Sequence, residues 1–244
     1  MIDMHTHLLP EIDDGSQSIQ DTFDMLDEAH KAGFTEIITT SHYMEKEYEV
    51  NRVQRQMLID AIQSKIDEKS MSLRLHNGAE IYIMPNLVSF VDNGTVPTLA
   101  ESRYVLFELP LNSNVIYTDT VIAKLVQNRY VPIIAHPERY EMVKQNPKVA
   151  LKWTEEGALL QANYASIIGL YGDKSKKALK SLLQMNLISF LGTDCHRPGS
   201  IYSKMNEIKA TYKKIIGEEK FEILSTINPR KIINDEYIAI DDDD

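Results

Sequence analysis

The chain has 244 residues, of which 43% are hydrophobic and 25% charged, so it can bury a core that suits one α/β barrel or one ordinary domain. A net charge of −10, without a basic run beyond short helical clusters, disfavours a nucleic-acid binder and with it a nuclease. The lone cysteine excludes an internal disulfide. No apolar stretch approaches the roughly 18 residues of a membrane span, and a β-type run at Met1 leaves no room for a signal peptide. We therefore expect a cytoplasmic protein.

Short β-type runs alternate with helical patterns along the chain. Strands are predicted at residues 2–5, 36–40, 73–81, 104–109, 131–135, 158–163 and 187–192. Helices are predicted at residues 19–32, 47–68, 118–128, 147–156 and 174–185, with two or three more after Ser200, one of them starting near Asn228. Strands that alternate with helices at this spacing form βαβ units and a parallel sheet.

The number of strands predicts the fold class. Seven or so strands in a chain of this length suit a closed or nearly closed α/β barrel, which we expect to form a single domain over residues 1–244. A doubly wound open sheet is the alternative. No glycine-rich phosphate motif follows the first strand, which weighs against a dinucleotide site. The acidic run at residues 241–244 is expected to be a solvated tail.

Five of the seven histidines fall at or just beyond the C-terminal end of a predicted strand: His5, His7, His42, His136 and His196. In a parallel barrel these strand ends gather on one face, where the active sites of such barrels lie. Five histidines would rarely gather on that face by chance, so a shared role is expected. His30, inside a helical pattern, and His76, on a polar strand edge, are interpreted as structural or surface residues.

Two pairs of residues share the spacing that a cation site in a strand needs. Side chains at i and i+2 of a strand project from the same side, roughly 6.5 Å apart, so His5 with His7, and Asp194 with His196, can each hold one cation. A His-x-His pair alone is a weak signal, and a lone histidine such as His42 is more often a packing residue. The combination of both pairs on the first and last strands is much stronger.

Carboxylates also end predicted strands. Glu80 and Glu108 each follow an apolar run, where an ionised carboxylate is costly unless a cation or a donor pairs with it. Taken singly, either is more often a salt-bridge partner. Asp13 and Asp14 lie in the first loop. Imidazoles and carboxylates without a thiolate suit Mn²⁺, Fe²⁺ or Zn²⁺, and several carboxylates favour Mn²⁺.

Four elements together resemble the PHP (polymerase and histidinol phosphatase) superfamily: His5-Thr6-His7, His42, His136 and Asp194-Cys195-His196. Within it, residues 1–10, 12–15, 78–81 and 134–140 resemble the bacterial manganese-dependent protein tyrosine phosphatases of capsule and exopolysaccharide biosynthesis. The resemblance extends from the first predicted strand to Asp194-Cys195-His196 and continues through the helices predicted after Ser200. It implies a distorted (β/α)7 TIM-like barrel with a centre of up to three divalent metals.

The resemblance implies three ligand sets. The first metal would be bound by His5, His7, Glu80 and Asp194; the second by Glu80, Glu108 and His136; and the third by Asp14, His42 and His196. The residues themselves leave open whether Asp13 or Asp14 is the ligand from the first loop.

Clustered divalent cations lower the pKa of bound water and hold phosphate oxygens, which suits phosphomonoester hydrolysis. Arg139, three residues past His136, can grip phosphate oxygens in a bidentate manner, the alternative being a salt bridge on the rim. Arg197 is the second candidate, although relatives often carry this arginine a few residues further from Asp-x-His. We expect His136 to be required for turnover.

Cys195 is not expected to be a nucleophile. Cysteine-dependent tyrosine phosphatases need Cys followed by five residues and then Arg, whereas the sixth residue after Cys195 is Ile201. The thiol is interpreted as a small apolar side chain between two ligands.

The predicted function is therefore that of a metal-dependent protein tyrosine phosphatase. By resemblance, its partner would be the tyrosine-rich tail of a bacterial tyrosine kinase that regulates polysaccharide synthesis. A small-molecule phosphatase of the histidinol-phosphate type shares the same metal centre and is the alternative, to be decided by the loops after His42 and Glu80. A metal-stabilised binding module is the non-enzymatic alternative, but structural metal sites are usually closed and often rich in thiolates.

Overall fold

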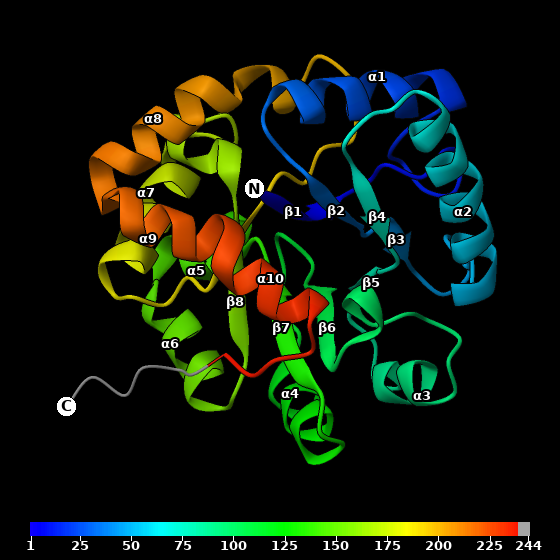
Figure 1. The fold of residues 1–244 in the computed structure, drawn as a ribbon. Coiled ribbons are helices and arrows are strands. Elements are labelled where there is room, and N and C mark those ends of the chain that lie inside the picture. Colours follow the sequence, from blue (N-terminus) through cyan, green and yellow to red (C-terminus); the bar gives the residue numbers. More distant parts are fainter. Residues whose placement is uncertain (239–244) are drawn as a thin grey trace.

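The computed structural model describes residues 1–238, and the acidic run at 241–244 lies outside them. Every pair of strands in the two sheets is parallel, as expected for βαβ units (Figure 1). One sheet has the order β1-β2-β4 and the other β3-β5-β6-β7-β8-β9. The strands are β1 (Ile2–Thr6), β2 (Glu36–Thr39), β3 (His42–Tyr43), β4 (Arg74–His76), β5 (Glu80–Tyr82), β6 (Tyr104–Glu108), β7 (Val131–Ala135), β8 (Leu159–Asn163) and β9 (Phe190–Gly192).

The two sheets are parts of one curled wall. β3 prolongs β2 and β5 prolongs β4 after short breaks, and the backbone N–H of Glu80 donates to the carbonyl of Thr40 across the breaks at 3.0 Å. At the other end, the N–H of His7 donates to the carbonyl of Cys195 at 3.0 Å, so the chain beyond β9 joins β1. The predicted TIM-like α/β barrel is confirmed, with seven strand positions in the described chain.

The prediction of one strand over residues 73–81 is wrong, because the segment forms β4 and β5 with a break at Asn77-Gly78-Ala79. A Cβ atom on Gly78 would lie 2.9 Å from the carbonyl oxygen of Thr39, so the break passes close to the neighbouring backbone. Asn77 turns aside and donates to the carbonyl of Arg52 at 3.1 Å. The break lets Glu80 start a new strand in register with His42.

Helices follow the strands and cover the outside of the wall (Figure 1). The predicted ones appear as α1 (Ile19–Lys31), α2 (Arg52–Glu68), α4 (Thr118–Gln127), α6 (Lys148–Glu155), α7 (Asp173–Gln184), α8 (Met205–Ile216) and α10 (Asn228–Ile233). The short helices α3 (Leu87–Asp92), α5 (Glu141–Gln145) and α9 (Glu218–Glu222) were not predicted individually. α2 begins later than predicted because Asn51 and Gln54 form a capping box at its start. None of the helices in residues 1–238 has both the length and the apolar character needed to cross a bilayer.

An irregularity in β1 sets the direction of the first histidine pair. Asp3 pairs with Ile37 and Thr6 with Thr39, so β1 has one extra residue between the two pairings. Such a bulge changes which face successive side chains reach. Met4 packs in the apolar cluster inside the barrel. Because of the bulge, the next side chain, His5, still reaches the C-terminal face of the barrel.

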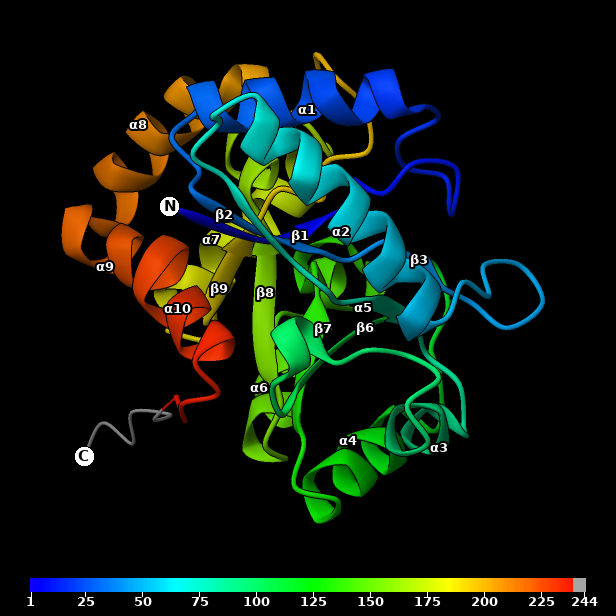
Figure 2. The same cartoon turned by 45° about the vertical axis from the view of Figure 1, so that its right-hand side comes forward.

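Two apolar clusters build the interior. The smaller one fills the inside of the wall and includes Met4, Ile38, Leu106, Ile133 and Phe190. The larger one includes residues of the strands and of the surrounding helices, which lie around the wall in the turned view of Figure 2. Alternate residues of β6 divide between the two, which leaves Glu108 at the strand end on the same side as Leu106.

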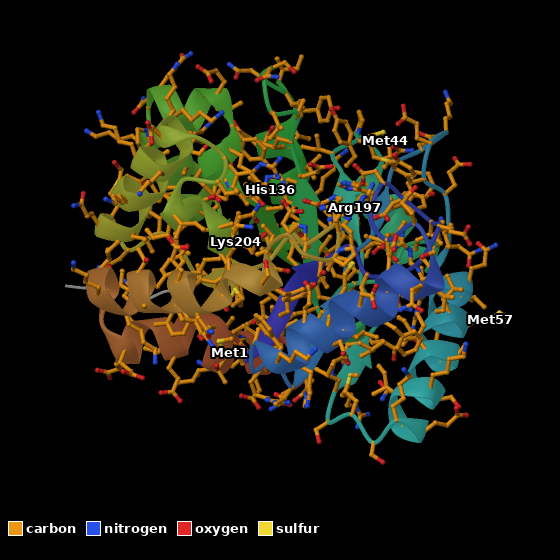
Figure 3. All side chains as sticks on the ribbon, turned by 90° about the horizontal axis from the view of Figure 1, so that it is seen from above. Met1, Met44, Met57, His136, Arg197 and Lys204 are labelled. Carbon is orange, nitrogen blue, oxygen red and sulfur yellow. The ribbon has the colours of Figure 1, made fainter. Side chains whose placement is uncertain are left out.

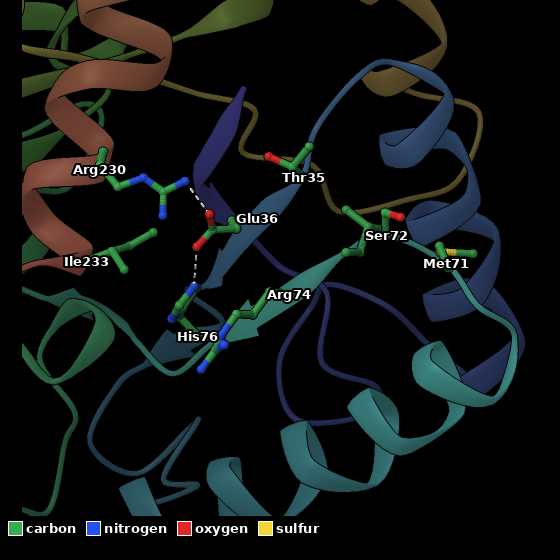
Figure 4. Close-up of a pocket in the computed structure, with 9 residues that line it drawn as sticks. Thr35, Glu36, Met71, Ser72, Arg74, His76, Arg230 and Ile233 are labelled. Atoms are coloured by element: carbon green, nitrogen blue, oxygen red, sulfur yellow. Dashed lines mark hydrogen bonds and ion pairs between the residues drawn. The ribbon is translucent and has the colours of Figure 1, made fainter.

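Ion pairs tie the strands together at the opposite, N-terminal face. Glu36 accepts from Arg230 of α10 and pairs with His76 of β4 at 2.9 Å, beside an open cavity of about 660 Å³ (Figure 4). These contacts agree with the structural interpretation of His76. Residues at this face of a TIM-type barrel usually serve stability.

Candidate metal centre

The five strand-end histidines converge on one site. The ring centroids of His7 and His196 are 3.8 Å apart, those of His7 and His42 4.4 Å, and those of His5 and His136 5.8 Å. His5 and His7 are fully buried. The strands supply these residues from both sheets, so the closure of the barrel is what brings them together.

The potential ligand atoms form three overlapping groups, each with atoms within 4.8 Å of one another: His5, His7, Glu80 and Asp194; His7, Asp14, His42 and His196; and His42, Glu80 and Glu108. The first group is the complete first ligand set implied by the family resemblance. The second group contains the complete third ligand set, Asp14, His42 and His196. It also contains His7, which therefore belongs to both the first and the second group. The site is therefore suited to several neighbouring cations.

One oxygen of Glu80 lies at the centre of the cluster. Its Oε2 is 3.2 Å from Nε2 of His5, 3.3 Å from Nε2 of His7 and 3.2 Å from Nδ1 of His42. This buried oxygen has no hydrogen-bond partner within residues 1–238. A buried carboxylate oxygen in that position is costly unless a cation pairs with it, so Glu80, which belongs to two of the three groups, would hold divalent metal here.

His136 and His42 both flank the pair of glutamates. Nε2 of His136 lies 2.9 Å from Oε1 of Glu80 and 3.7 Å from Oε2 of Glu108. Nδ1 of His42 lies 3.2 Å from the nearest oxygen of each glutamate. The structure thus brings the implied second set together and places His42 beside it as well, a shared position that the sequence did not predict.

Two of these residues have backbone conformations that favour glycine. His136 has φ 33° and Asp194 has φ 53°. Non-glycine residues with positive φ cost free energy and gather at functional sites. Tyr140 supports the turn at His136: its hydroxyl donates to the carbonyl of Ala135 at 2.8 Å and accepts from the N–H of Leu109 at 2.9 Å.

The structure separates the two aspartates of the first loop. Asp14 reaches the cluster, with Oδ1 at 3.4 Å from Nε2 of His196 and 3.6 Å from Nε2 of His42. Asp13 instead accepts a hydrogen bond from Nδ1 of His7 at 2.8 Å and from the N–H of His42 at 2.7 Å. Asp14 is therefore in the position of a ligand. Asp13 instead orients His7, a candidate ligand, by binding the ring nitrogen that faces away from the cluster.

Sequence reasoning missed two polar residues on β8. Oε1 of Gln161 lies 2.7 Å from Nδ1 of His5, and Nδ2 of Asn163 donates to Oδ2 of Asp194 at 2.6 Å. Such contacts fix the orientation of metal ligands. Their i, i+2 spacing at the end of a buried strand was the available signal, since it repeats the pattern of His5 and His7.

Arg139 contacts the cluster directly. Its Nη1 donates to Oδ2 of Asp194 at 2.6 Å, and its guanidinium carbon lies 4.6 Å from the ring centre of Tyr171. Arg139 thus forms a salt bridge with Asp194 rather than with Glu138 or Glu11, the partners considered for a rim salt bridge. A guanidinium has five N–H donors, so Arg139 keeps donors available for a phosphate while it neutralises Asp194.

Arg197 and Cys195 have other surroundings. Nη1 of Arg197 donates to the carbonyls of Asp14 (2.6 Å), Gly15 and His196 (2.8 Å), so this arginine ties the first loop to the last one. Sγ of Cys195 is buried and lies 3.4 Å from the carbonyl of Arg197. The thiol thus points toward the backbone of its own loop, in agreement with a non-nucleophilic role.

The charges of the site indicate what it must bind. Burial and the negative charges of Glu80 and Asp194 raise the pKa of Glu108 to about 9. Burial and the charge of His7 lower the pKa of His42 to about 4, which keeps that imidazole neutral, as a metal ligand must be. Crowded carboxylates therefore demand compensating positive charge, and imidazole and carboxylate donors without a thiolate fit divalent cations such as Mn²⁺, Fe²⁺ or Zn²⁺.

Replacement of Asp13 by asparagine tests the orienting role. We expect Asp13→Asn to weaken metal binding by about 10-fold to 100-fold, because it removes the carboxylate that holds His7. Excess metal should restore most of the turnover. Titration of the stripped protein with Mn²⁺ measures the change, and Asp21→Asn on α1 serves as the control. An unchanged metal affinity in Asp13→Asn would contradict this role.

The fold and the site agree with known enzymes. A solved structure reported as "YwqE from Bacillus subtilis and CpsB from Streptococcus pneumoniae, unique metal-dependent tyrosine phosphatases" superposes with a TM-score of 0.92 at 27% identity and covers 98% of this chain and 96% of its own. This likeness, together with the clustered candidate ligands, identifies the class as metal-dependent phosphomonoesterases. The family described as "Capsular polysaccharide synthesis, CpsB/CapC" matches residues 1–234, and the chain belongs to that family.

Individual relatives support the same class. The chain is 30% identical over 221 residues to a putative tyrosine-protein phosphatase CapC of Staphylococcus aureus, covering 88% of this chain and 87% of the relative. It is 28% identical over 243 residues to the tyrosine-protein phosphatase CpsB of Streptococcus pneumoniae, covering 98% and 100%. A histidinol phosphate phosphatase of Lactococcus lactis, at 15% identity and a TM-score of 0.58, covering 88% of this chain and 94% of its own, shares the fold alone. The predicted PHP-type family and the predicted enzyme class are confirmed.

Proposed function

We propose that this chain is a manganese-dependent protein tyrosine phosphatase, and that its ligand residues are His5, His7, Asp14, His42, Glu80, Glu108, His136, Asp194 and His196. The observation that carries the proposal is the convergence of three imidazoles on the unpaired oxygen of Glu80, in a chain whose relatives are metal-dependent tyrosine phosphatases. Manganese is favoured because several carboxylates share the site with imidazoles.

The protein's own side chains prepare the site for a phosphate ester. When bound, divalent cations supply positive charge for the phosphate oxygens and lower the pKa of water. Asp13 and Gln161 hold the first two histidines in one orientation. Arg139, anchored on Asp194, directs its remaining N–H groups to a phosphate oxygen. A phenolate leaving group has a pKa near 10, so it departs with little help from a general acid.

The site's openness favours a protein substrate. The side chain of Asp14 is 57% exposed and that of His196 28%, whereas His5, His7 and Glu80 are fully buried. The cluster is thus open on the side of Asp14 and His196. An open rim suits a tyrosine on a flexible tail, and membership of a capsular polysaccharide synthesis family makes a bacterial tyrosine kinase in the cytoplasm the proposed partner.

A comparison of two substrates tests the proposal. With Mn²⁺ present, kcat/KM for a phosphotyrosine peptide should exceed that for histidinol phosphate by at least about 100-fold, equivalent to roughly 2.7 kcal/mol of transition-state binding. Purified protein stripped of metal provides the baseline. A higher kcat/KM for histidinol phosphate would favour the small-molecule alternative and overturn the proposed substrate.

A further inference from the structure

An aromatic side chain stands at the mouth of the metal centre. The ring of Tyr48 lies 6.0 Å from the ring of His42, with the two planes only 18° apart. Tyr48 is half-buried, and it belongs to the segment between β3 and α2 that projects beside the barrel in Figure 2. Figure 3 labels Met44, the start of this segment, together with His136 and Arg197 in the view from above. The ring therefore covers the outer side of a candidate ligand.

Backbone contacts hold Tyr48 in place. Met44 and Tyr48 exchange two backbone hydrogen bonds, at 3.0 and 2.8 Å, which close a tight hairpin. The turn uses a left-handed residue, Lys46 with φ 71°. The fully buried Arg55 fixes the base, because it donates to the carbonyl of His42 at 2.6 Å and to that of Val50 at 2.8 Å. The ring thus has a defined position relative to the cluster.

Tyr48 lies on the side from which a substrate must enter. The cluster is exposed at Asp14 and His196, and Tyr48 adjoins this opening. A phosphate ester that reached the cluster through this opening would place the group beyond its ester oxygen beside Tyr48.

We propose that Tyr48 is a specificity-determining residue that packs against the aromatic ring of the substrate and favours aryl over alkyl phosphates. This inference rests on the proposed function and adds the residue that distinguishes the substrate class. Offset or edge-to-face aromatic pairs contribute a selectivity of about tenfold. A phenylalanine can make the same contact, whereas an alanine cannot.

The alternative role for Tyr48 is to support His42 by stacking. The two roles differ in a measurable way, because loss of support for a ligand weakens every phosphate equally. Phenylphosphonate and methylphosphonate make a matched pair of non-hydrolysable probes, since they present the same phosphonate with and without a ring.

The experiment measures inhibition constants of both probes against turnover of a phosphotyrosine peptide by the Mn²⁺-loaded protein. Wild type and Tyr48→Phe should bind phenylphosphonate about tenfold more tightly than methylphosphonate. Tyr48→Ala should lose this preference and leave methylphosphonate binding within about twofold. Tyr237→Ala, which removes an exposed tyrosine beside Arg103, is the control and should behave as wild type.

Two results would overturn the inference. Equal weakening of both probes in Tyr48→Ala would show that the ring only supports His42, and an unchanged preference would show that it makes no contact with the substrate ring. Both results would leave the proposed function standing, because wild type would still hydrolyse phosphotyrosine. Absence of phosphotyrosine turnover in wild type would overturn the proposed function and this inference together.

Discussion

Glu80→Gln should lower kcat/KM for a phosphotyrosine peptide by at least about a thousandfold. The substitution keeps the size of the side chain but replaces the carboxylate oxygen that three imidazoles surround at 3.2 to 3.3 Å. An amide is a poor bridge between divalent cations because it carries no negative charge. The loss should appear in kcat and should be accompanied by a lower metal content per chain.

Glu36→Gln is the matched control for that substitution. Glu36 is likewise a strand glutamate paired with a histidine, but it is half-buried and lies at the opposite face of the barrel. Its replacement should lower the free energy of unfolding by about 1–3 kcal/mol, since it leaves Arg230 and His76 without their partner. Turnover of the folded protein should remain near wild type. Turnover of Glu80→Gln within tenfold of wild type would contradict the central position of Glu80.

Arg139→Gln should lower kcat/KM by roughly 100-fold to 1,000-fold, the range found when one charged or hydrogen-bonding group that stabilises a transition state is removed. Arg139 has two expected contributions: it neutralises Asp194, to which it donates at 2.6 Å, and under the proposed function its other N–H groups would bind the phosphate. The inhibition constant of inorganic phosphate should rise in parallel. Circular dichroism would establish that the variant is folded.

Arg197→Gln provides the comparison for Arg139. Arg197 donates to backbone carbonyls of Asp14, Gly15 and His196, so its loss should loosen the first loop and weaken metal binding without removing a phosphate contact. We expect a loss of turnover of about tenfold that excess Mn²⁺ largely restores. A larger loss in Arg197→Gln than in Arg139→Gln, unaffected by metal, would reverse the two assignments.

The sequence predicted the features that depend on local periodicity. Alternating strand and helix patterns predict the barrel, and the barrel places His5, His42 and His136 on one face. These predictions needed only the direction of side chains along a strand and the parallel order of the strands. The prediction that Asp194 and His196 lie on the last strand is wrong, because β9 ends at Gly192 and Asp194 has a left-handed backbone, although both side chains still reach the cluster.

Features that depend on contacts between distant segments were not predictable in this way. The proposal of Asp14 rather than Asp13 as a ligand depends on a hydrogen bond that Asp13 accepts from the N–H of His42, 29 residues further along the chain. The bulge in β1 arises from its pairing with β2, and the break before Glu80 from close approach to Thr39. Positive φ at His136 is likewise imposed by the surrounding fold rather than by the residue type.

Metal content measured together with turnover tests the central claim most directly. Purified protein stripped by a chelator should have no phosphotyrosine phosphatase activity. Added Mn²⁺ should restore the activity as the metal content rises toward three ions per chain. That number corresponds to one ion for each of the three overlapping ligand groups: His5, His7, Glu80 and Asp194; His7, Asp14, His42 and His196; and His42, Glu80 and Glu108. Full turnover by protein that elemental analysis shows to be free of divalent metal would contradict the account.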